Sequence, residues 1–359
     1  MSVVDAALKW IRANFFGDWS SSALTILLVI LFWFTIPPFV EWALIKSTFG
    51  GETKADCDPG GACWTFIGQR LPNFFYGRYP VDERWRVNLA ALLLAAFTTP
   101  ALMDRLRHRW VAVLALVAVY PVIAGVLLVG GVLGLAFVDT SLWGGLMLNT
   151  VLSFVALAGS LPLGILLALG RRSELPAIRY FCVGFIELWR GVPLLTALFM
   201  ATIILPLFLP EGVSLDRLVR AALALTLFTS AYMAEVIRGG LQGVPMGQGE
   251  AARSLGLGYW PMQVLIVLPQ ALRLVVPAIV NTAIDLFKDT TLVLIIGLFD
   301  LLGMVNLSLK DSAWLGMASE GFTFAAMVFF VCCLLMSLYS RRLERRLAEP
   351  TRRTGPAPA

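Results

Sequence analysis

Residues 23–42 read ALTILLVILFWFTIPPFVEW, and Glu41 is the only charged residue in this run. About 20 mostly apolar residues are enough for one transmembrane helix, so the run predicts a membrane span. It is too long for the apolar region of a signal peptide, and no small-residue cleavage site follows it, so we expect the span to be retained. The rest of the chain has the same character, with 58% hydrophobic and 14% charged residues among 359. This composition excludes an ordinary soluble enzyme, a disordered chain and a nucleic-acid-binding module.

Seven further apolar segments follow the first one. The eight candidate spans lie at about 22–45, 87–103, 110–137, 143–169, 176–209, 218–238, 274–305 and 319–340. The sequence therefore predicts an all-α fold, a polytopic membrane helical bundle of about eight spans. The fifth segment would reach about 51 Å as a single helix, which exceeds the hydrocarbon core of about 30 Å. We expect an amphipathic cytoplasmic helix over 176–190 and a turn into the membrane at Gly191 and Pro193.

The distribution of Lys and Arg favours a multi-pass membrane protein with both termini in the cytoplasm, where loops carry an excess of positive charge. The clearest clusters are the run Arg105–Arg109, which contains the only histidine, His108, and the basic tail 343–359. The outer loop 46–86 is an exception, because it also carries several positive residues. The net charge of +5 is thus better explained by topology than by nucleic-acid binding. A single histidine excludes a metal site with two histidine ligands.

A polar loop over about 238–262 interrupts the apolar segments, and residues 250–269 within and after it read EAARSLGLGYWPMQVLIVLP. Glu250, Ala251 and Ala252 are expected to begin a short helix whose small side chains allow close approach by another protein. Gly256 lets the chain bend. The stretch resembles, without mismatch, the EAA-x3-G-x9-I-x-LP loop of ABC importer permeases. The alternative is an ordinary interfacial helix with a chance match.

The neighbouring segments extend this resemblance to the permeases of polar-amino-acid importers. They are ELWRGVPLL at 187–195, AYMAEVIRGG at 231–240, GQGE at 247–250, LPQALR at 268–273 and KDTTL at 288–292. The likeness covers about 145–342 and implies a five-span type I permease core over 141–342. The preceding residues 1–140 are interpreted as a three-span extension with the outer loop 46–86. That extension resembles the M-type permeases of the general L-amino-acid (Aap/Bzt) importers.

The resemblance implies an ABC importer subunit that moves polar L-amino acids by alternating access. It implies a second permease subunit, a cytoplasmic ATPase dimer and a periplasmic amino-acid-binding protein as partners. The chain contains no Gly-Lys dipeptide and hence no phosphate loop of the GxxxxGK[ST] type. We therefore expect no enzyme activity and no cofactor in this chain, with ATP and Mg bound by the partner ATPase. The residues expected to couple to that ATPase are Glu250, Ala251, Ala252 and Gly256.

Charged residues inside the apolar segments point to a candidate substrate pathway or gate. Three pairs place an acid three residues before a base, so that each pair shares one helix face: Glu187 with Arg190, Glu235 with Arg238, and Asp285 with Lys288. An unpaired charge costs about 2.5–3.5 kcal/mol at the bilayer centre, so the pairs either neutralise charge for insertion or form a path for a zwitterionic substrate. Asp289 remains available for a substrate ammonium group. Pro269 and Pro277 predict a broken helix that lines a path along 277–292, where Asn281, Thr290 and Thr291 add polar groups.

Cys57 and Cys63 flank the polar turn DPGGA. They can form a disulfide if this loop faces an oxidising compartment, and the sequence leaves open whether they do.

Three other classes of protein remain as alternatives. An ion-driven secondary transporter would also place acids and broken helices in the membrane, but no inverted hydropathy repeat is visible. A membrane enzyme would need a convergent set of acid, base or nucleophile, and none is visible. A non-transporting membrane scaffold is the third. Only the ABC importer requires a tightly bound ATPase.

Overall fold

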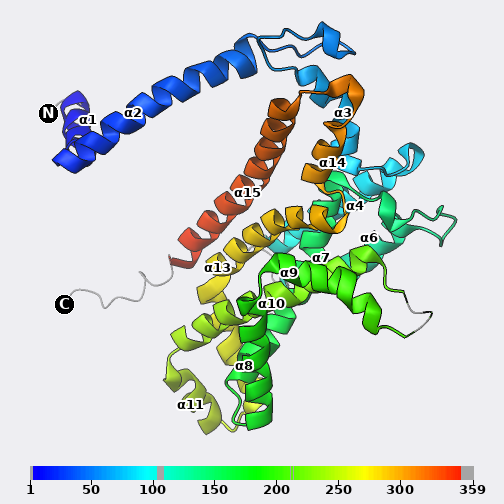
Figure 1. The fold of residues 1–359 in the computed structure, drawn as a ribbon. Coiled ribbons are helices and arrows are strands. Elements are labelled where there is room, and N and C mark those ends of the chain that lie inside the picture. Colours follow the sequence, from blue (N-terminus) through cyan, green and yellow to red (C-terminus); the bar gives the residue numbers. More distant parts are fainter. Residues whose placement is uncertain (1–2, 103–108, 211, 213, 349–359) are drawn as a thin grey trace. The chain divides into compact units, whose positions relative to one another are not determined.

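The computed structural model describes residues 3–102, 109–210, 212 and 214–348, and the described residues are mainly helical (Figure 1). The basic run with His108 and most of the predicted tail lie outside this part of the chain. The α-helices are α1 (Val3–Phe15), α2 (Trp19–Val40), α3 (Trp64–Tyr76), α4 (Arg84–Leu102), α5 (Arg109–Leu114), α6 (Tyr120–Val129), α7 (Gly145–Arg171), α8 (Pro176–Gly191), α9 (Leu194–Phe199), α10 (Arg217–Gly243), α11 (Met246–Ser254), α12 (Tyr259–Met262), α13 (Leu268–Asp289), α14 (Leu301–Ser308) and α15 (Ala318–Ala348).

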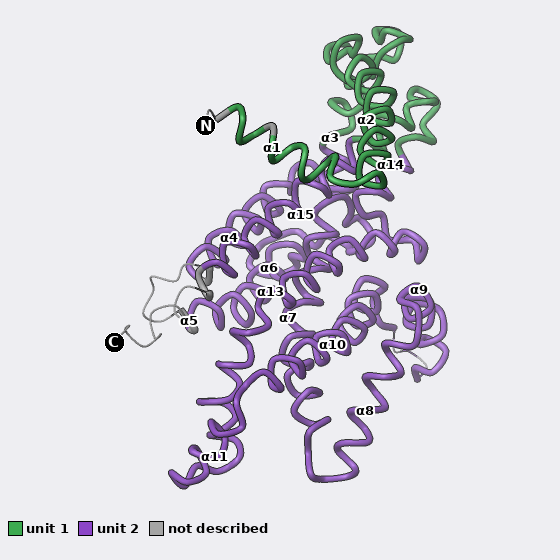
Figure 2. Tube along the Cα trace, turned by 90° about the vertical axis from the view of Figure 1, so that its left-hand side faces the viewer, with its two compact units in different colours: residues 1–71, 308–323 green, residues 72–307, 324–359 purple. Residues whose placement is uncertain are grey.

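The chain divides into two compact units, which Figure 2 shows in different colours. The first contains residues 1–71 and 308–323, and the second contains 72–307 and 324–359. The predicted boundary at residue 140 follows the extent of the sequence resemblance and is a different division. It stays a prediction.

In the first unit, the loop after α2 is held against the segment 308–323. Cys57 and Cys63 are joined by a disulfide with their Cα atoms 5.4 Å apart. The backbone N–H of Cys63 donates to the Glu320 carboxylate over 3.2 Å. Lys54 Nζ donates to the carbonyl of Leu315 over 2.6 Å. The loop is thus closed by a disulfide and held to the segment 308–323 by two hydrogen bonds.

In the second unit, α7 and α10 form a pair that runs in the same direction. The Thr140 hydroxyl before α7 donates to Asp216 Oδ2 before α10 over 2.5 Å, so the two helices begin together. At their other ends, Arg172 donates to the carbonyl of Leu241 over 3.2 Å. Gly164 of α7 allows the close contact, because a Cβ atom there would lie 2.8 Å from the Cβ of Met233. Glycines at such positions let helices approach closely.

Helix α13 packs against α10 and begins near its C-terminal end. A Cβ atom at Gly240 would lie 2.6 Å from the carbonyl oxygen of Ala271, so the backbones of α10 and α13 nearly touch there. One apolar cluster surrounds this region, with Ile237, Leu241, Met262 and Ala271 among its buried members. The helix α11, which contains the EAA motif, follows α10 at this same end.

The expected turn at Gly191 and Pro193 is confirmed. The axis of Pro176–Gly191 and that of Leu194–Phe208 differ by 104°. Val192 between them is extended, with φ −95° and ψ 131°. A proline disfavours the helical conformation of the residue before it, which explains why the first helix ends here.

The prediction of an all-α membrane helical bundle is confirmed, with fewer clear spans among the described residues than the eight predicted. Six helices in the described residues are long and apolar enough to cross a membrane, or seven if the bent pair is one span. The segment predicted at 87–103 is the helix α4, which is not among them. Its first residues include Arg84, Arg86 and Asn88, and Thr98 and Thr99 lie near its end. Only Leu89–Phe97 is a long stretch free of polar residues.

The prediction of a broken helix at Pro269 and Pro277 is wrong, as is the predicted segment 274–305. Tyr259–Ile296 is one helical span of 38 residues, and Pro277 lies inside α13. Pro269 is the second residue of α13 and directly follows the π-helical turn Gln263–Val267, and the helix continues past it. The span stops at Gly297, which has a left-handed φ of +81° and ends the helix.

Candidate functional site

The EAA motif forms the short exposed helix α11, which the chain enters from α10 through Val244 and Pro245. Of its three motif residues, Ala252 is buried, with 1% of its surface exposed, and belongs to the same apolar cluster as Leu241 and Met262. Glu250 and Ala251 are exposed. The motif therefore has two faces: Ala252 attaches the helix to the protein, and the other two residues are presented outward.

Gly256 stops this helix in a left-handed conformation, with φ of +79°. Its N–H donates to the carbonyl of Arg253 over 2.9 Å, and the N–H of Leu257 donates to the carbonyl of Ala252 over 3.2 Å. This is the usual geometry of a glycine helix stop. No heavy atom lies within 4 Å of where a Cβ atom would be, so the backbone and not the space requires glycine. Leu255 next to it is 80% exposed and adds an apolar contact surface.

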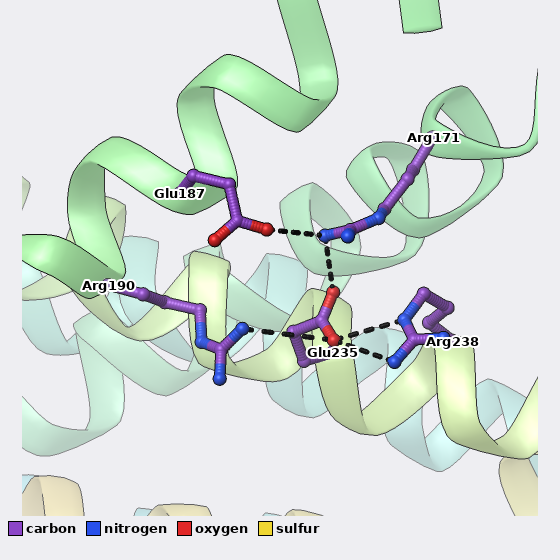
Figure 3. A network of polar contacts seen from close by, with 5 residues as sticks. All are labelled: Arg171, Glu187, Arg190, Glu235 and Arg238. Carbon is purple, nitrogen blue, oxygen red and sulfur yellow. Dashed lines mark hydrogen bonds and ion pairs between the residues drawn. The ribbon is translucent and has the colours of Figure 1, made fainter. Parts of the chain in front are cut away.

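A network of five charged side chains lies where α7, α8 and α10 meet near the α11 end (Figure 3). Glu235 of α10 is at its centre and pairs with Arg171 over 2.8 Å, with Arg238 over 2.9 Å and with Arg190 over 3.8 Å. Glu187 of α8 joins through Arg171 over 3.2 Å. The Glu235 side chain is 18% exposed, the lowest value of the five, and its two oxygens serve three guanidinium groups. The network ties three helices to one carboxylate.

Two of the three predicted acid–base pairs form, and one does not. Glu235 pairs with Arg238, and Asp285 pairs with Lys288 over 2.9 Å. The structure contains no ion pair between Glu187 and Arg190. Each of these two has a partner on another helix instead, and the sequence gives no sign of this because Arg171 comes from the end of α7. Ion pairs with other helices form instead, because Glu187 and Arg190 lie at the end of α8, next to the neighbouring helices.

A cavity of about 550 Å³ has Tyr232 in its wall. The Arg190 guanidinium lies 5.8 Å from the centroid of the Tyr232 ring, and Tyr232 lines the cavity. The volume is in the range of small-molecule sites. The polar side chains that line it come from α10 and α13: Thr229, Tyr232, Thr282, Asp285, Lys288 and Asp289.

The charges in this cavity suit a zwitterion. Lys288 supplies an ammonium group, although Asp285 pairs with it. Asp289 is half-buried and makes no ion pair within the described residues. One carboxylate is thus free to accept from a substrate ammonium group, and the Lys288 ammonium can be shared with a substrate carboxylate. Thr229 and Thr282 add hydroxyl groups.

Two other predicted pathway residues lie outside the cavity lining. Asn281 is exposed, and Thr290 is fully buried in a separate hydrogen-bond network. Asn149 Nδ2 donates to the Thr290 hydroxyl over 2.8 Å and to Asp300 over 3.1 Å. Asn149 Oδ1 in turn accepts from the N–H of Leu301 over 3.0 Å. This network joins α7 to the end of α13 and the start of α14. Sequence spacing does not indicate it, because Asn149 is more than 100 residues from its partners.

The described residues contain no group of three or more His, Cys, Asp or Glu side chains that could hold a metal ion.

These features define a class: a multi-pass helical membrane protein with a cavity of small-molecule size and an exposed, glycine-stopped helix joined to the helices that line it. The family model described as "Binding-protein-dependent transport system inner membrane component" matches residues 160–349. The chain belongs to this family of inner-membrane transport permeases. The match confirms the resemblance drawn from the EAA motif.

Relatives that match over most of their length are named as amino-acid transport permeases. The chain is 52% identical to the inner membrane amino-acid ABC transporter permease protein YhdY of Escherichia coli (strain K12), over 95% of this chain and 93% of the relative. It is 38% identical to the glutamate/glutamine/aspartate/asparagine transport system permease protein BztC of Rhodobacter capsulatus, over 95% of this chain and 94% of that protein. A crystal structure of an amino acid ABC transporter with histidines matches with a TM-score of 0.50 and 32% identity, over 56% of this chain and 92% of that one.

Proposed function

We propose that this chain is a permease subunit of an ATP-driven ABC importer that moves polar L-amino acids across the inner membrane by alternating access. The observation that carries the proposal is the continuity of α10, α11 and α13. The exposed EAA helix lies between the two helices that line the 550 Å³ cavity. A partner that moves α11 therefore moves both walls of the cavity.

In this mechanism, a cytoplasmic ATPase dimer binds ATP and Mg and contacts Glu250 and Ala251 on the outer face of α11. Ala252 and the apolar cluster around it transmit the displacement into α10 and α13. ATP changes the conformation of the spans only if the ATPase binds it more tightly in one state than in the other. The glycine stop at Gly256 keeps α11 short and separate from the long helix that follows it. The EAA end and both termini then lie in the cytoplasm, which requires α4 to cross the membrane as an eighth span.

Substrate selection follows from the cavity. Asp289 accepts hydrogen bonds from the substrate ammonium group, and Lys288 donates to the carboxylate. Arg190, stacked on Tyr232, links this cavity to the Glu235 network. A change in the packing of α8 against α10 therefore reaches the cavity wall through one side chain.

The proposal includes a second permease subunit and a periplasmic amino-acid-binding protein. BztC is named as a permease for glutamate, glutamine, aspartate and asparagine, which supports polar amino acids as the substrate class. The family description, with its dependence on a binding protein, supports the delivery step.

The test uses the assembled complex in proteoliposomes, with ATP inside the compartment that the EAA helix faces. ATP hydrolysis is measured with binding protein that is empty or loaded with each amino acid of a panel. We expect stimulation by a polar subset only. A bound ATPase that no amino acid stimulates would contradict the substrate class, and a permease that retains no ATPase would contradict the assembly.

A further inference from the structure

A second cavity, of about 340 Å³, lies where α7 and α10 begin, at the end of this helix pair opposite α11. Helix α10 has 27 residues, so the two ends are about 40 Å apart at 1.5 Å per residue. The residues that give this cavity its character are Arg78, Trp143, Asp216, Arg217, Arg220 and Phe299. They come from four separate segments of the second unit.

Three guanidinium groups converge here against one carboxylate, and that carboxylate is already in use. Asp216 Oδ1 accepts from the N–H groups of Leu218 and Val219 over 2.8 and 3.3 Å, which makes it the N-cap of α10. Its Oδ2 accepts from the Thr140 hydroxyl. No ion pair joins any of the three arginines to an acid among the described residues. The cavity thus keeps a net positive charge.

The helix itself adds to this positive potential. Arg217 and Arg220 lie in the first turn of α10, where the aligned peptide dipoles place a partial positive charge. Acidic side chains are favoured at this position and basic ones are disfavoured. Two positive side chains at the positive end of the helix are unfavourable in the ligand-free protein. A bound anion would make this electrostatic interaction favourable.

Two donors on residues that line the cavity have no acceptor in the described structure. Trp143 is buried, with 6% of its surface exposed, and its Nε1–H has no hydrogen-bond partner in the described structure. The Nε of Arg220 is also buried without a partner, while its terminal nitrogen donates to the carbonyl of Thr202. Arg78 donates to the carbonyl of Ser141 over 2.8 Å and lies over the Phe299 ring. Buried donors without acceptors are costly, so their presence on one cavity indicates an acceptor that binds there.

We propose that this cavity binds a carboxylate group that approaches from the side of the membrane opposite the EAA helix. Guanidinium groups bind carboxylates in a paired, planar geometry, and the indole N–H adds a third kind of donor. The direction of approach rests on the proposed function, because it requires the EAA helix to be cytoplasmic. The carboxylate belongs either to the amino acid that is being released or to an acidic side chain of the binding protein that delivers it.

Arg217 is the residue with which to test this proposal, because its side chain makes no hydrogen bond within the described structure. The first measurement is equilibrium binding of radiolabelled L-glutamate to the permease–ATPase assembly in nanodiscs, without nucleotide or binding protein. We expect Arg217→Gln to weaken binding about tenfold, as for loss of one charged hydrogen bond. Trp143→Phe, which removes the Nε1–H donor and shortens the buried ring, should weaken it about threefold. Arg179→Gln, which removes an exposed arginine on α8, is the control and should change nothing.

The second measurement is the affinity of glutamate-loaded binding protein for the same nanodiscs at two salt concentrations. If the carboxylate is on the binding protein, Arg217→Gln weakens docking about tenfold and reduces its salt dependence, while binding of free glutamate is unchanged. If both measurements are the same in the variant and the wild type, the proposal is wrong. Neither measurement needs ATP turnover, so failure here is distinct from a failure of amino-acid-stimulated hydrolysis, which would contradict the proposed function.

Discussion

The two ends of the α7–α10 pair carry similar numbers of arginines. At one end these arginines pair with acidic side chains, and at the other they have no acidic partner among the described residues. At the α11 end, Arg171, Arg190 and Arg238 share the carboxylate of Glu235, and Glu187 adds a second acid. At the other end, Arg78, Arg217 and Arg220 have no acidic partner among the described residues, and Asp216 caps the helix. The difference teaches that charge within one helix pair can have two functions. Compensated charge holds helices together, and uncompensated charge is available to a ligand.

Removal of Glu235 should cause the largest loss of stability. Glu235→Ala leaves three arginines facing each other, and breaking a fully buried pair costs about 3–5 kcal/mol. We expect about 3 kcal/mol, at the lower limit, because the side chain is 18% exposed. The free energy of unfolding of the purified complex in nanodiscs measures this effect. Glu174→Ala, which removes an exposed acid before α8, is the control, and an equal effect of both variants would contradict the compensated end.

Removal of Asp216 should cost less, because it acts as a cap and not as the centre of an ion-pair network. Asp216→Ala removes the acceptor for the N–H groups of Leu218 and Val219, and loss of an N-cap costs about 1 kcal/mol. Asp216→Asn keeps an N-cap acceptor and should recover most of this loss. The same unfolding experiment applies. If Asp216→Asn is as unstable as Asp216→Ala, then charge compensation of the arginines, and not capping, is the function of Asp216.

Removal of Arg217 should stabilise the ligand-free protein slightly. Arg217→Gln takes a positive charge from the positive end of α10, where such a charge is unfavourable by about 0.3–1 kcal/mol. This sign is opposite to that for Glu235→Ala, and it is the sharpest form of the comparison. A loss of more than about 1 kcal/mol would mean that Arg217 has a structural partner, and that this end too is compensated.

The smallest effect concerns an acid outside both ends, Asp56 in the loop of the first unit. Hydrogen bonds from the backbone N–H groups of Thr53 and Glu52 lower the pKa of its carboxyl group. Because the folded pKa lies below the unfolded one, the contribution of Asp56 is present above the ordinary pKa of about 4 and is lost as the pH falls through the lower, folded value. Hydrogen-exchange protection of the Thr53 amide should therefore be constant from neutral pH to about 5 and decrease in more acidic solution. In Asp56→Asn the decrease should disappear, and a decrease that persists would assign it to another group.

The features that could be predicted from sequence are those that depend on neighbours in the chain. The turn at Gly191 and Pro193 follows from the conformational limits of these two residue types. The pairs Glu235–Arg238 and Asp285–Lys288 follow from helix spacing. The EAA helix and its stop at Gly256 follow from the motif itself.

The features that could not be predicted depend on which helices meet. Glu187 takes Arg171 as its partner in place of Arg190, because the end of α7 lies beside α8. Helix α13 passes through Pro277 because the rest of the long helix keeps its hydrogen bonds and packs against α10. The arginine cavity is formed by segments around residues 78, 143, 217 and 299, whose distance in sequence gives no indication that they converge.

We propose that α11 is the contact through which ATP hydrolysis drives transport. The variant Gly256→Trp tests this role of α11 directly. The variant forces a large residue into a left-handed conformation that costs about 1–2 kcal/mol and places an indole on the exposed face of the EAA helix. The measurement is amino-acid uptake per ATP hydrolysed in proteoliposomes, with Gly258→Ala, whose φ of −67° suits any residue, as the control. We predict that the variant inserts and keeps the second permease subunit, while uptake per ATP falls at least about tenfold. Substrate-stimulated uptake at the wild-type level in Gly256→Trp would contradict the claim.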